Sequence, residues 1–180
     1  YKYSVTLSDG QTRHIEITNL RDLVGLEHDV STWCVWVWSL KEFIRDEAEQ
    51  VGKSPDWWKD KVRTCRALQV CADLANSEKH GKLDREWTGL KLKLGPAKCT
   101  VPQAALGRLT VTPDTAIIDT ADPELVEFEV PVLAEGNSNI GDALDFLQEA
   151  MDAWESALTE LRDTGSQWYQ LDNPFVTVFA

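Results

Sequence analysis

Apolar residues recur at every third or fourth position in three long stretches of this chain, and that spacing constrains its fold more than any other feature. One face of an α-helix repeats with this period, so each stretch predicts an amphipathic helix that must bury one side. The helices are expected over residues 20–51, 55–80 and 139–164. The last stretch has the clearest pattern, with apolar residues at Ile140, Leu144, Leu147, Met151, Trp154, Leu158 and Leu161.

The first predicted helix carries more apolar surface than a single face provides. Its regular series is Leu23, Leu26, Val30, Trp33, Val37, Leu40, Ile44, Ala48 and Val51. Trp36, Trp38 and Phe43 lie beside this series and widen it. We therefore expect the middle of this helix to be buried on most of its sides.

Alternation with a period of two appears outside the helices. Residues 1–18 predict a β-hairpin with a turn at 8–11, residues 85–133 predict an antiparallel β-meander, and residues 166–180 form a tail. A chain of 180 residues can bury a core without disulfides or metals. The prediction is a single α+β domain over 1–180: a bundle of three long amphipathic helices, with the N-terminal hairpin and the meander between the second and third helices.

The cysteines and the hydropathy pattern predict a cytoplasmic protein. Cys34, Cys65, Cys71 and Cys99 match no zinc-binding spacing, so we expect free thiols in a reducing compartment and no metal site. The densest apolar run, residues 33–38, is far shorter than the roughly 20 residues that span a membrane. No signal peptide and no nucleotide-binding motif is recognised, so we expect no membrane partner and no cofactor.

The charge is strongly negative overall but uneven along the sequence. The chain has 18 Lys and Arg against 30 Asp and Glu, a net charge of −12. Residues 53–98 hold 11 bases against six acids, or +5, and the rest of the chain carries −17. Negative charge repels nucleic acid, so contact with nucleic acid is expected only through the basic segment 53–98.

A row of polar residues follows one edge of the second predicted helix, whose other positions are mostly apolar. The row consists of Arg66, Gln69, Asp73, Asn76 and His80, spaced by three and four. Three interpretations stay open: a solvent-facing stripe, a hydrogen-bond network between helices, or a binding or catalytic surface. Histidine suits the last of these because its imidazole transfers protons near neutral pH.

The segment from Asp73 to Gly81 resembles the Asn-x-x-x-His stretch of HEPN-type helical proteins, a superfamily that includes ribonucleases of toxin–antitoxin and phage-defence systems. Asn76 and His80 match that stretch, whereas Ala75 stands where the family pattern has an arginine. The resemblance implies a helical bundle in which His80 and Asn76 act on RNA. Stabilisation of the phosphate charge then falls to Lys79, Lys82 or Arg85.

Three functions are compatible with these features. The preferred one is an acidic protein of a bacterial or phage type that acts as a protein-binding or regulatory module, without enzymatic activity. Its binding residues are expected among Arg66, Gln69, Asp73, Lys79, Lys82 and Arg85. The alternative is a HEPN-like ribonuclease, or a degenerate form of one, that uses His80 and Asn76. The third is a homo-oligomer whose long helices pair between chains.

Overall fold

The computed structural model describes residues 2–6, 8, 10–80, 86–112 and 115–164. Its helices are α1 (Leu23–Gln50), α2 (Trp57–Thr64), α3 (Arg66–His80) and α4 (Ala143–Asp163). Its strands are β1 (Lys2–Thr6), β2 (Thr12–Thr18), β3 (Lys93–Leu94), β4 (Lys98–Thr100), β5 (Leu106–Val111), β6 (Thr115–Thr120), β7 (Glu127–Glu129), β8 (Pro131–Leu133) and β9 (Asn139–Asp142). Short 3-10 helices lie at Gln103–Ala105, Pro123–Leu125 and Glu135–Asn137.

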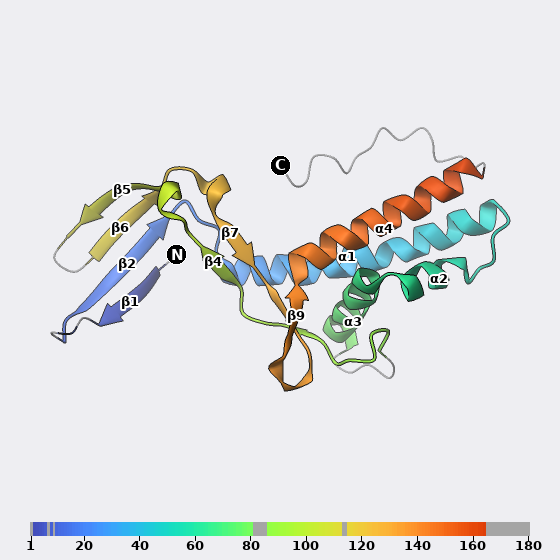
Figure 1. Ribbon diagram of the computed structural model, residues 1–180, viewed down its shortest axis with the longest axis horizontal. Helices are drawn as coiled ribbons and strands as arrows, with labels where there is room; N and C mark the ends of the chain where they lie inside the picture. Colours follow the sequence, from blue (N-terminus) through green and yellow to red (C-terminus); the bar gives the residue numbers. More distant parts are fainter. Residues whose placement is uncertain (1, 7, 9, 81–85, 113–114, 165–180) are drawn as a thin grey trace.

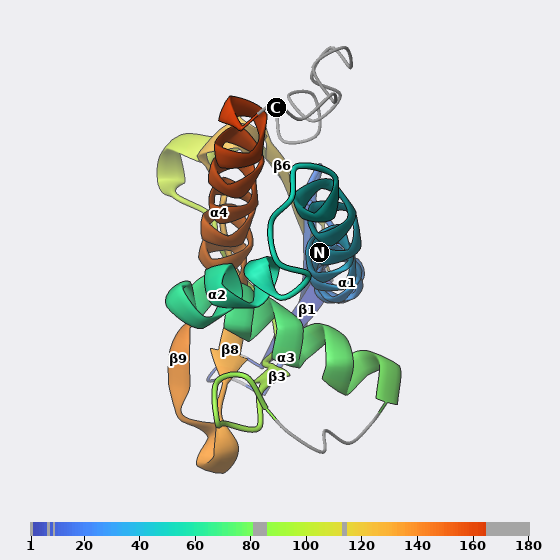
Figure 2. The same ribbon diagram turned by 90° about the vertical axis from the view of Figure 1, so that its right-hand side faces the viewer.

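The core lies among three helices. Helices α1 and α4 lie side by side and run in the same direction (Figure 1), and α3 crosses both of them on one side (Figure 2). The apolar faces of the three helices meet at Val30, Cys34, Ile44, Leu68, Trp154 and Leu161, all of them buried. Within the part of the chain that the structure describes, no helix combines the length and the apolar character that crossing a membrane requires.

The predicted second helix is wrong, because residues 55–80 form two helices rather than one. The chain leaves the helical conformation at Cys65, which is extended (φ −116°, ψ 111°). The Gln69 side chain explains how the break is tolerated: its Nε2 donates to the carbonyls of Val62 and Arg63, both at 3.0 Å. These carbonyls lose their helical partners at the break, and the amide replaces them. The turn lets α3 cross α1 and α4 instead of lying along them.

The predicted meander is also wrong, and with it the three-helix-bundle architecture. The chain is α+β, but its strands form three separate sheets. Sheet A has the order β1-β2-β6-β5, sheet B has β3-β8-β9, and sheet C pairs β4 with β7. In sheet A, β6 lies parallel to β2, the second strand of the N-terminal hairpin. Alternation along a strand reveals its two faces but not its partner, which here lies about a hundred residues away in the sequence.

Helix α4 begins later than predicted. Residues 139–142, predicted as the first turn of the helix, are strand β9, and the helix begins at Ala143. The Asp142 side chain fixes this boundary because its Oδ1 accepts from the backbone N–H groups of Leu144 and Val130, both at 3.0 Å. One carboxylate therefore caps α4 and ties it to the sheet B region.

Candidate functional site

Asp73, the middle residue of the predicted polar row, has a structural role. Its side chain is 0% exposed, although α3 is otherwise apolar around it. Both oxygens accept hydrogen bonds from the segment that follows the helix: Oδ1 from the Trp87 N–H at 2.8 Å, and Oδ2 from the Thr88 N–H at 2.9 Å and the Thr88 hydroxyl at 2.6 Å. A buried carboxylate needs such donors. Asp73 therefore anchors residues 86–90 against α3.

The other residues of the row face different surroundings. Gln69 binds the last carbonyls of α2, as described above, and Arg66 is exposed. Asn76 is half-buried, one helical turn after Asp73. Helix α3 continues unbroken to His80. The side chains of Lys79 and His80 lie outside the described part of the chain, as do residues 82 and 85, which carry the Lys82 and Arg85 predicted to bind.

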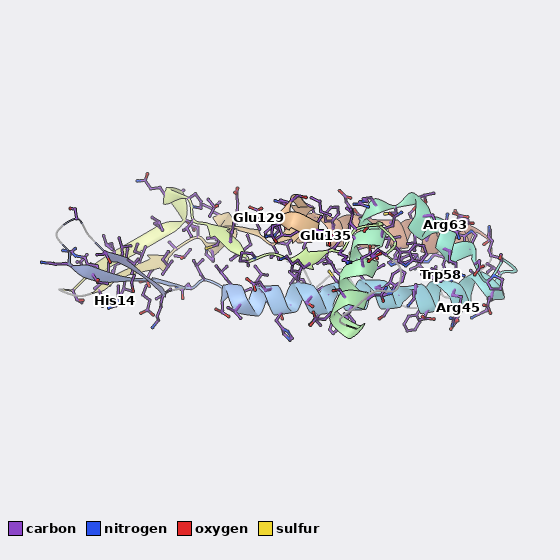
Figure 3. All side chains as sticks on the ribbon, turned by 90° about the horizontal axis from the view of Figure 1, so that it is seen from below. His14, Arg45, Trp58, Arg63, Glu129 and Glu135 are labelled. Carbon is purple, nitrogen blue, oxygen red and sulfur yellow. The ribbon has the colours of Figure 1, made fainter. Side chains whose placement is uncertain are left out.

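The described bases of segment 53–98 are mostly paired with acids, four of them with acids of other elements and two with acids inside the segment. Six of its eight described Lys and Arg residues lie within 4.0 Å of a carboxylate. Lys53 and Lys61 both contact Glu160 of α4, and the hydrogen bond from Lys61 lowers the pKa of that carboxyl. Figure 3 shows Arg63 near the helical end of the molecule, and Glu129 and Glu135, the partners of Lys98 and Lys91, nearer the middle. Lys53, Lys61, Lys91 and Lys98 therefore join different elements of the fold and do not form an open anion-binding patch.

Three tryptophans form a cluster beside the break between α2 and α3. The ring centroids of Trp38, Trp58 and Trp87 lie 6.0–6.2 Å apart in edge-on and tilted arrangements. The Lys41 ammonium lies 4.7 Å from the Trp38 ring centroid. Such contacts are typical of packed aromatic groups and stabilise by roughly 0.5–1.5 kcal/mol per ring pair. The cluster joins α1, α2 and the segment anchored by Asp73.

Two aromatic side chains of α1 remain uncovered, contrary to the expectation that the middle of this helix is buried on most sides. Trp36 is 65% exposed and Phe43 is 60% exposed. Seven residues separate them, so they point in directions only about 20° apart and form one line along the helix. Trp38 is buried, as are Val37 and Ile44. The apolar arc of α1 is therefore wider than the surface that α3 and α4 cover.

Sheet A presents a second uncovered apolar surface. Successive residues of a strand point to opposite faces, and registered partners share a face. The residues on the face of Ile15, called the apolar face below, include Val5, Ile15, Ile17, Leu106, Leu109, Val111, Ala116 and Ile118. Leu109 and Val111 are 59% and 58% exposed. Sequence reasoning missed this surface because the partnership of β2 with β6 is not visible in local alternation.

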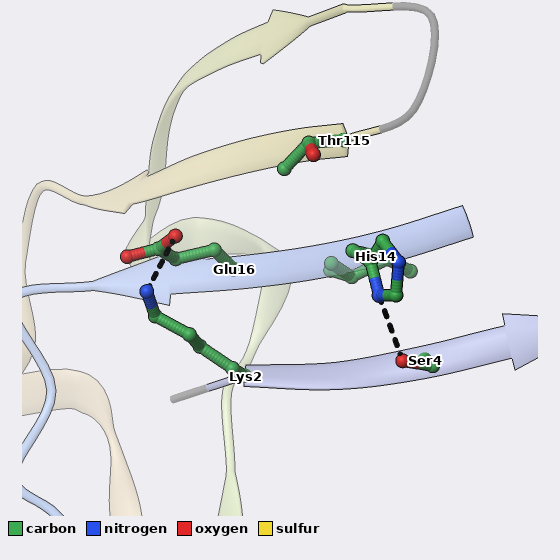
Figure 4. Close-up of a pocket in the computed structure, with 6 residues that line it drawn as sticks. Lys2, Ser4, His14, Glu16 and Thr115 are labelled. Atoms are coloured by element: carbon green, nitrogen blue, oxygen red, sulfur yellow. Dashed lines mark hydrogen bonds and ion pairs between the residues drawn. The ribbon is translucent and has the colours of Figure 1, made fainter.

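The opposite face of sheet A is mainly polar and slightly hollowed. Figure 4 shows the hollow, whose side chains on this face are Lys2, Ser4, His14, Glu16 and Thr115. Its polar groups pair across neighbouring strands: the Ser4 hydroxyl lies 2.9 Å from Nδ1 of His14, and the Lys2 ammonium lies 3.1 Å from a carboxylate oxygen of Glu16. Cross-strand pairs of this kind stabilise a solvated sheet face.

These features define an elongated α+β protein with a helical body, a sheet at one end and two uncovered apolar surfaces. The chain matches no family model, and no curated protein and no solved structure is similar to it.

Proposed function

We propose that the chain is a protein-binding module whose binding surface is the outer face of α1, centred on Trp36 and Phe43. The supporting observation is the exposure of this aligned aromatic pair on a helix whose other large apolar residues, apart from Val24 in its first turn, are buried or partly buried. Exposing about 60% of an aromatic side chain leaves roughly 100–150 Å² of apolar surface in water. At about 25 cal/mol per Å², each ring offers on the order of 3 kcal/mol to a partner that covers it.

The charge around this surface indicates the chemistry of the partner. Helix α1 carries two Lys and Arg against six Asp and Glu, a net charge of −4, and the neighbouring α4 carries one base against six acids, a net charge of −5. These two helices account for most of the net charge of −12. A basic partner with an apolar centre, such as a nucleic-acid-binding enzyme held inactive, fits this surface. The opposite charges steer its approach.

The proposal predicts that Trp36→Ala weakens partner binding by at least about 30-fold, because a central aromatic truncated at an interface costs about 2 kcal/mol or more. The partner is first identified in the cells of origin with a photo-cross-linking amino acid at position 43. Isothermal titration with the purified partner then gives the dissociation constants.

Val24→Ala is the matched control for that measurement. Val24 lies on the same helix and is 72% exposed, but points about a third of a turn away from Trp36. The dissociation constant of the Val24→Ala variant should stay within about threefold of the wild-type value, as for a residue outside the interface. A Trp36→Ala variant that binds as tightly as the wild type rules out α1 as the binding surface.

A ribonuclease of the HEPN type is the second candidate, favoured by the continuity of α3. Because the helix is unbroken from Arg66 to His80, Asn76 and His80 lie one turn apart on the same side of it. In this proposal, His80 transfers a proton at a ribose 2′-hydroxyl, and Asn76 orients that hydroxyl. General acid–base catalysis is typically worth 10²–10⁴-fold in rate.

The ribonuclease proposal predicts that His80→Ala lowers RNA cleavage at least about 100-fold, whereas His14→Ala leaves it unchanged. His14 is a fitting control because it lies in sheet A, bonded to Ser4. Labelled single-stranded RNA incubated with each purified protein provides the measurement. This candidate is removed if the wild type cleaves RNA no faster than background, or if His80→Ala and His14→Ala cleave it at the same rate.

We also propose that the protein works in the cytoplasm, because all four cysteines are free thiols. Cys34 and Cys71 are buried between α1 and α3. Hydrogen bonding with Cys34, together with burial, raises the pKa of the Cys71 thiol well above its ordinary value. A thiol held protonated in this way is a packing residue and reacts slowly with oxidants.

A further inference from the structure

Within the part of the chain that the structure describes, sheet A is a single layer and no second layer covers its apolar face. Among its described residues only Thr120 is buried. The sheet lies at the end of the molecule beyond the start of α1, and no described helix packs over either face (Figure 1). One face is mainly polar and its cross-strand pairs suit water, whereas the other carries the eight side chains of the apolar face. A sheet of this kind needs a second layer to bury that face.

We propose that the second layer is the same sheet of a second copy of this chain, so that two apolar faces pack together around a two-fold axis. The result is a small β-sandwich made of two sheets about 10 Å apart. A two-fold axis brings the same patch of each copy together, and this requires a patch that fits itself. The apolar face meets that requirement because it is made of aliphatic side chains, with Arg13 as the charged residue in its register.

Charge determines how two copies can be arranged at this end of the molecule. Helices α1 and α4 carry a combined charge of −9, and they extend away from sheet A along the long axis (Figure 1). Two helical bodies of like charge repel each other when they lie close together. A two-fold axis perpendicular to the strands points the bodies in opposite directions. The acidic helices then lie at the two ends of the dimer.

The size of the face predicts a dimer of modest affinity. Four strands of five to seven residues, about 4.8 Å apart with about 3.3 Å per residue, give a face of roughly 19 by 20 Å. Two such faces, with the relief of their side chains, bury about 1,000 Å² in total, near the lower limit for specific interfaces. We therefore expect dissociation in the micromolar range and a dimer at tens of micromolar.

Sedimentation equilibrium between about 1 and 200 µM tests the proposal. Wild-type mass should rise with concentration from the 20.3 kDa of one chain towards twice that value. Leu109→Asp places a charge in the apolar face and should weaken association at least 30-fold. Thr110→Asp is the matched control, because Thr110 is the next residue of β5 and points to the opposite face. Its dissociation constant should stay within threefold of the wild-type value.

Circular dichroism and urea unfolding of each variant establish that it is folded, and Val111→Ala provides a milder substitution in the same face. Val111→Ala should weaken association by severalfold without altering the spectrum. A wild-type protein that stays monomeric at 200 µM overturns the proposal. So does a dimer that Leu109→Asp leaves intact, or one that Leu109→Asp and Thr110→Asp weaken equally. Trp36→Ala should leave the dimer unchanged, since α1 lies outside this interface.

Discussion

Replacing Asp73 with alanine is expected to lower the free energy of unfolding by about 3–4 kcal/mol. The substitution removes the acceptors of the Trp87 and Thr88 N–H groups, which lie 2.8 and 2.9 Å from the carboxylate. Each buried donor left without a partner costs about 1–3 kcal/mol. The Thr88 hydroxyl contributes less to the loss, because the Leu90 carbonyl at 3.2 Å offers it a second acceptor. Urea unfolding followed by tryptophan fluorescence measures the change.

Asp152→Ala is the control for Asp73. Asp152 lies exposed on α4 and accepts one hydrogen bond, from Gln148 at 2.8 Å. A surface substitution of this kind changes stability by about 0.5 kcal/mol or less. An Asp73→Ala variant whose unfolding midpoint matches that of Asp152→Ala would show that residues 86–90 do not depend on the buried carboxylate.

The second large effect is expected at Trp154, whose replacement by alanine should lower the free energy of unfolding by about 4–5 kcal/mol. Its indole is 1% exposed in the core between α1 and α4, and its Nε1 donates to the Val37 carbonyl at 2.9 Å. Trp154 is the largest of the described side chains that are fully buried, so its truncation leaves a large cavity. Trp154→Phe keeps most of the ring volume and should cost about half as much.

Chemical unfolding monitored by circular dichroism compares these variants with Glu155→Ala, which alters the next, exposed residue of the same helix. Glu155→Ala should change stability by about 0.5 kcal/mol or less. A Trp154→Ala variant whose free energy of unfolding falls by under about 1.5 kcal/mol would contradict the packing of α4 against α1. Truncating a buried indole typically costs about 3–5 kcal/mol.

The long helices were predictable because their apolar residues repeat with the helical period. Helices α1 and α4 follow the predicted series closely, and the N-terminal hairpin forms with β1 and β2 antiparallel. The break at Cys65 was not predictable, since neither glycine nor proline marks it. It depends on Gln69 reaching back to two carbonyls of α2, a contact that exists only after the chain turns. The grouping of strands into sheets likewise depends on contacts between distant segments.

The sequence also showed which residues share a side of a helix, but not what lies opposite them. The spacing of the polar row placed Asp73 and Asn76 together on α3. It could not show that the backbone N–H groups of Trp87 and Thr88 donate hydrogen bonds to the Asp73 carboxylate. Trp36 and Phe43 were expected in the core because of their apolar character. Their exposure follows from where α3 and α4 cross α1, which residue type alone does not determine.

If Trp36 and Phe43 serve binding rather than the fold, the Trp36→Ala, Phe43→Ala double variant should be nearly as stable as the wild type. Urea unfolding of the isolated protein needs no knowledge of the partner. Exposed side chains contribute little to folding, so the free energy of unfolding should fall by under about 1 kcal/mol. A fall of about 6 kcal/mol or more, the sum for two buried aromatic rings, would show that they belong to the core and would contradict the claim.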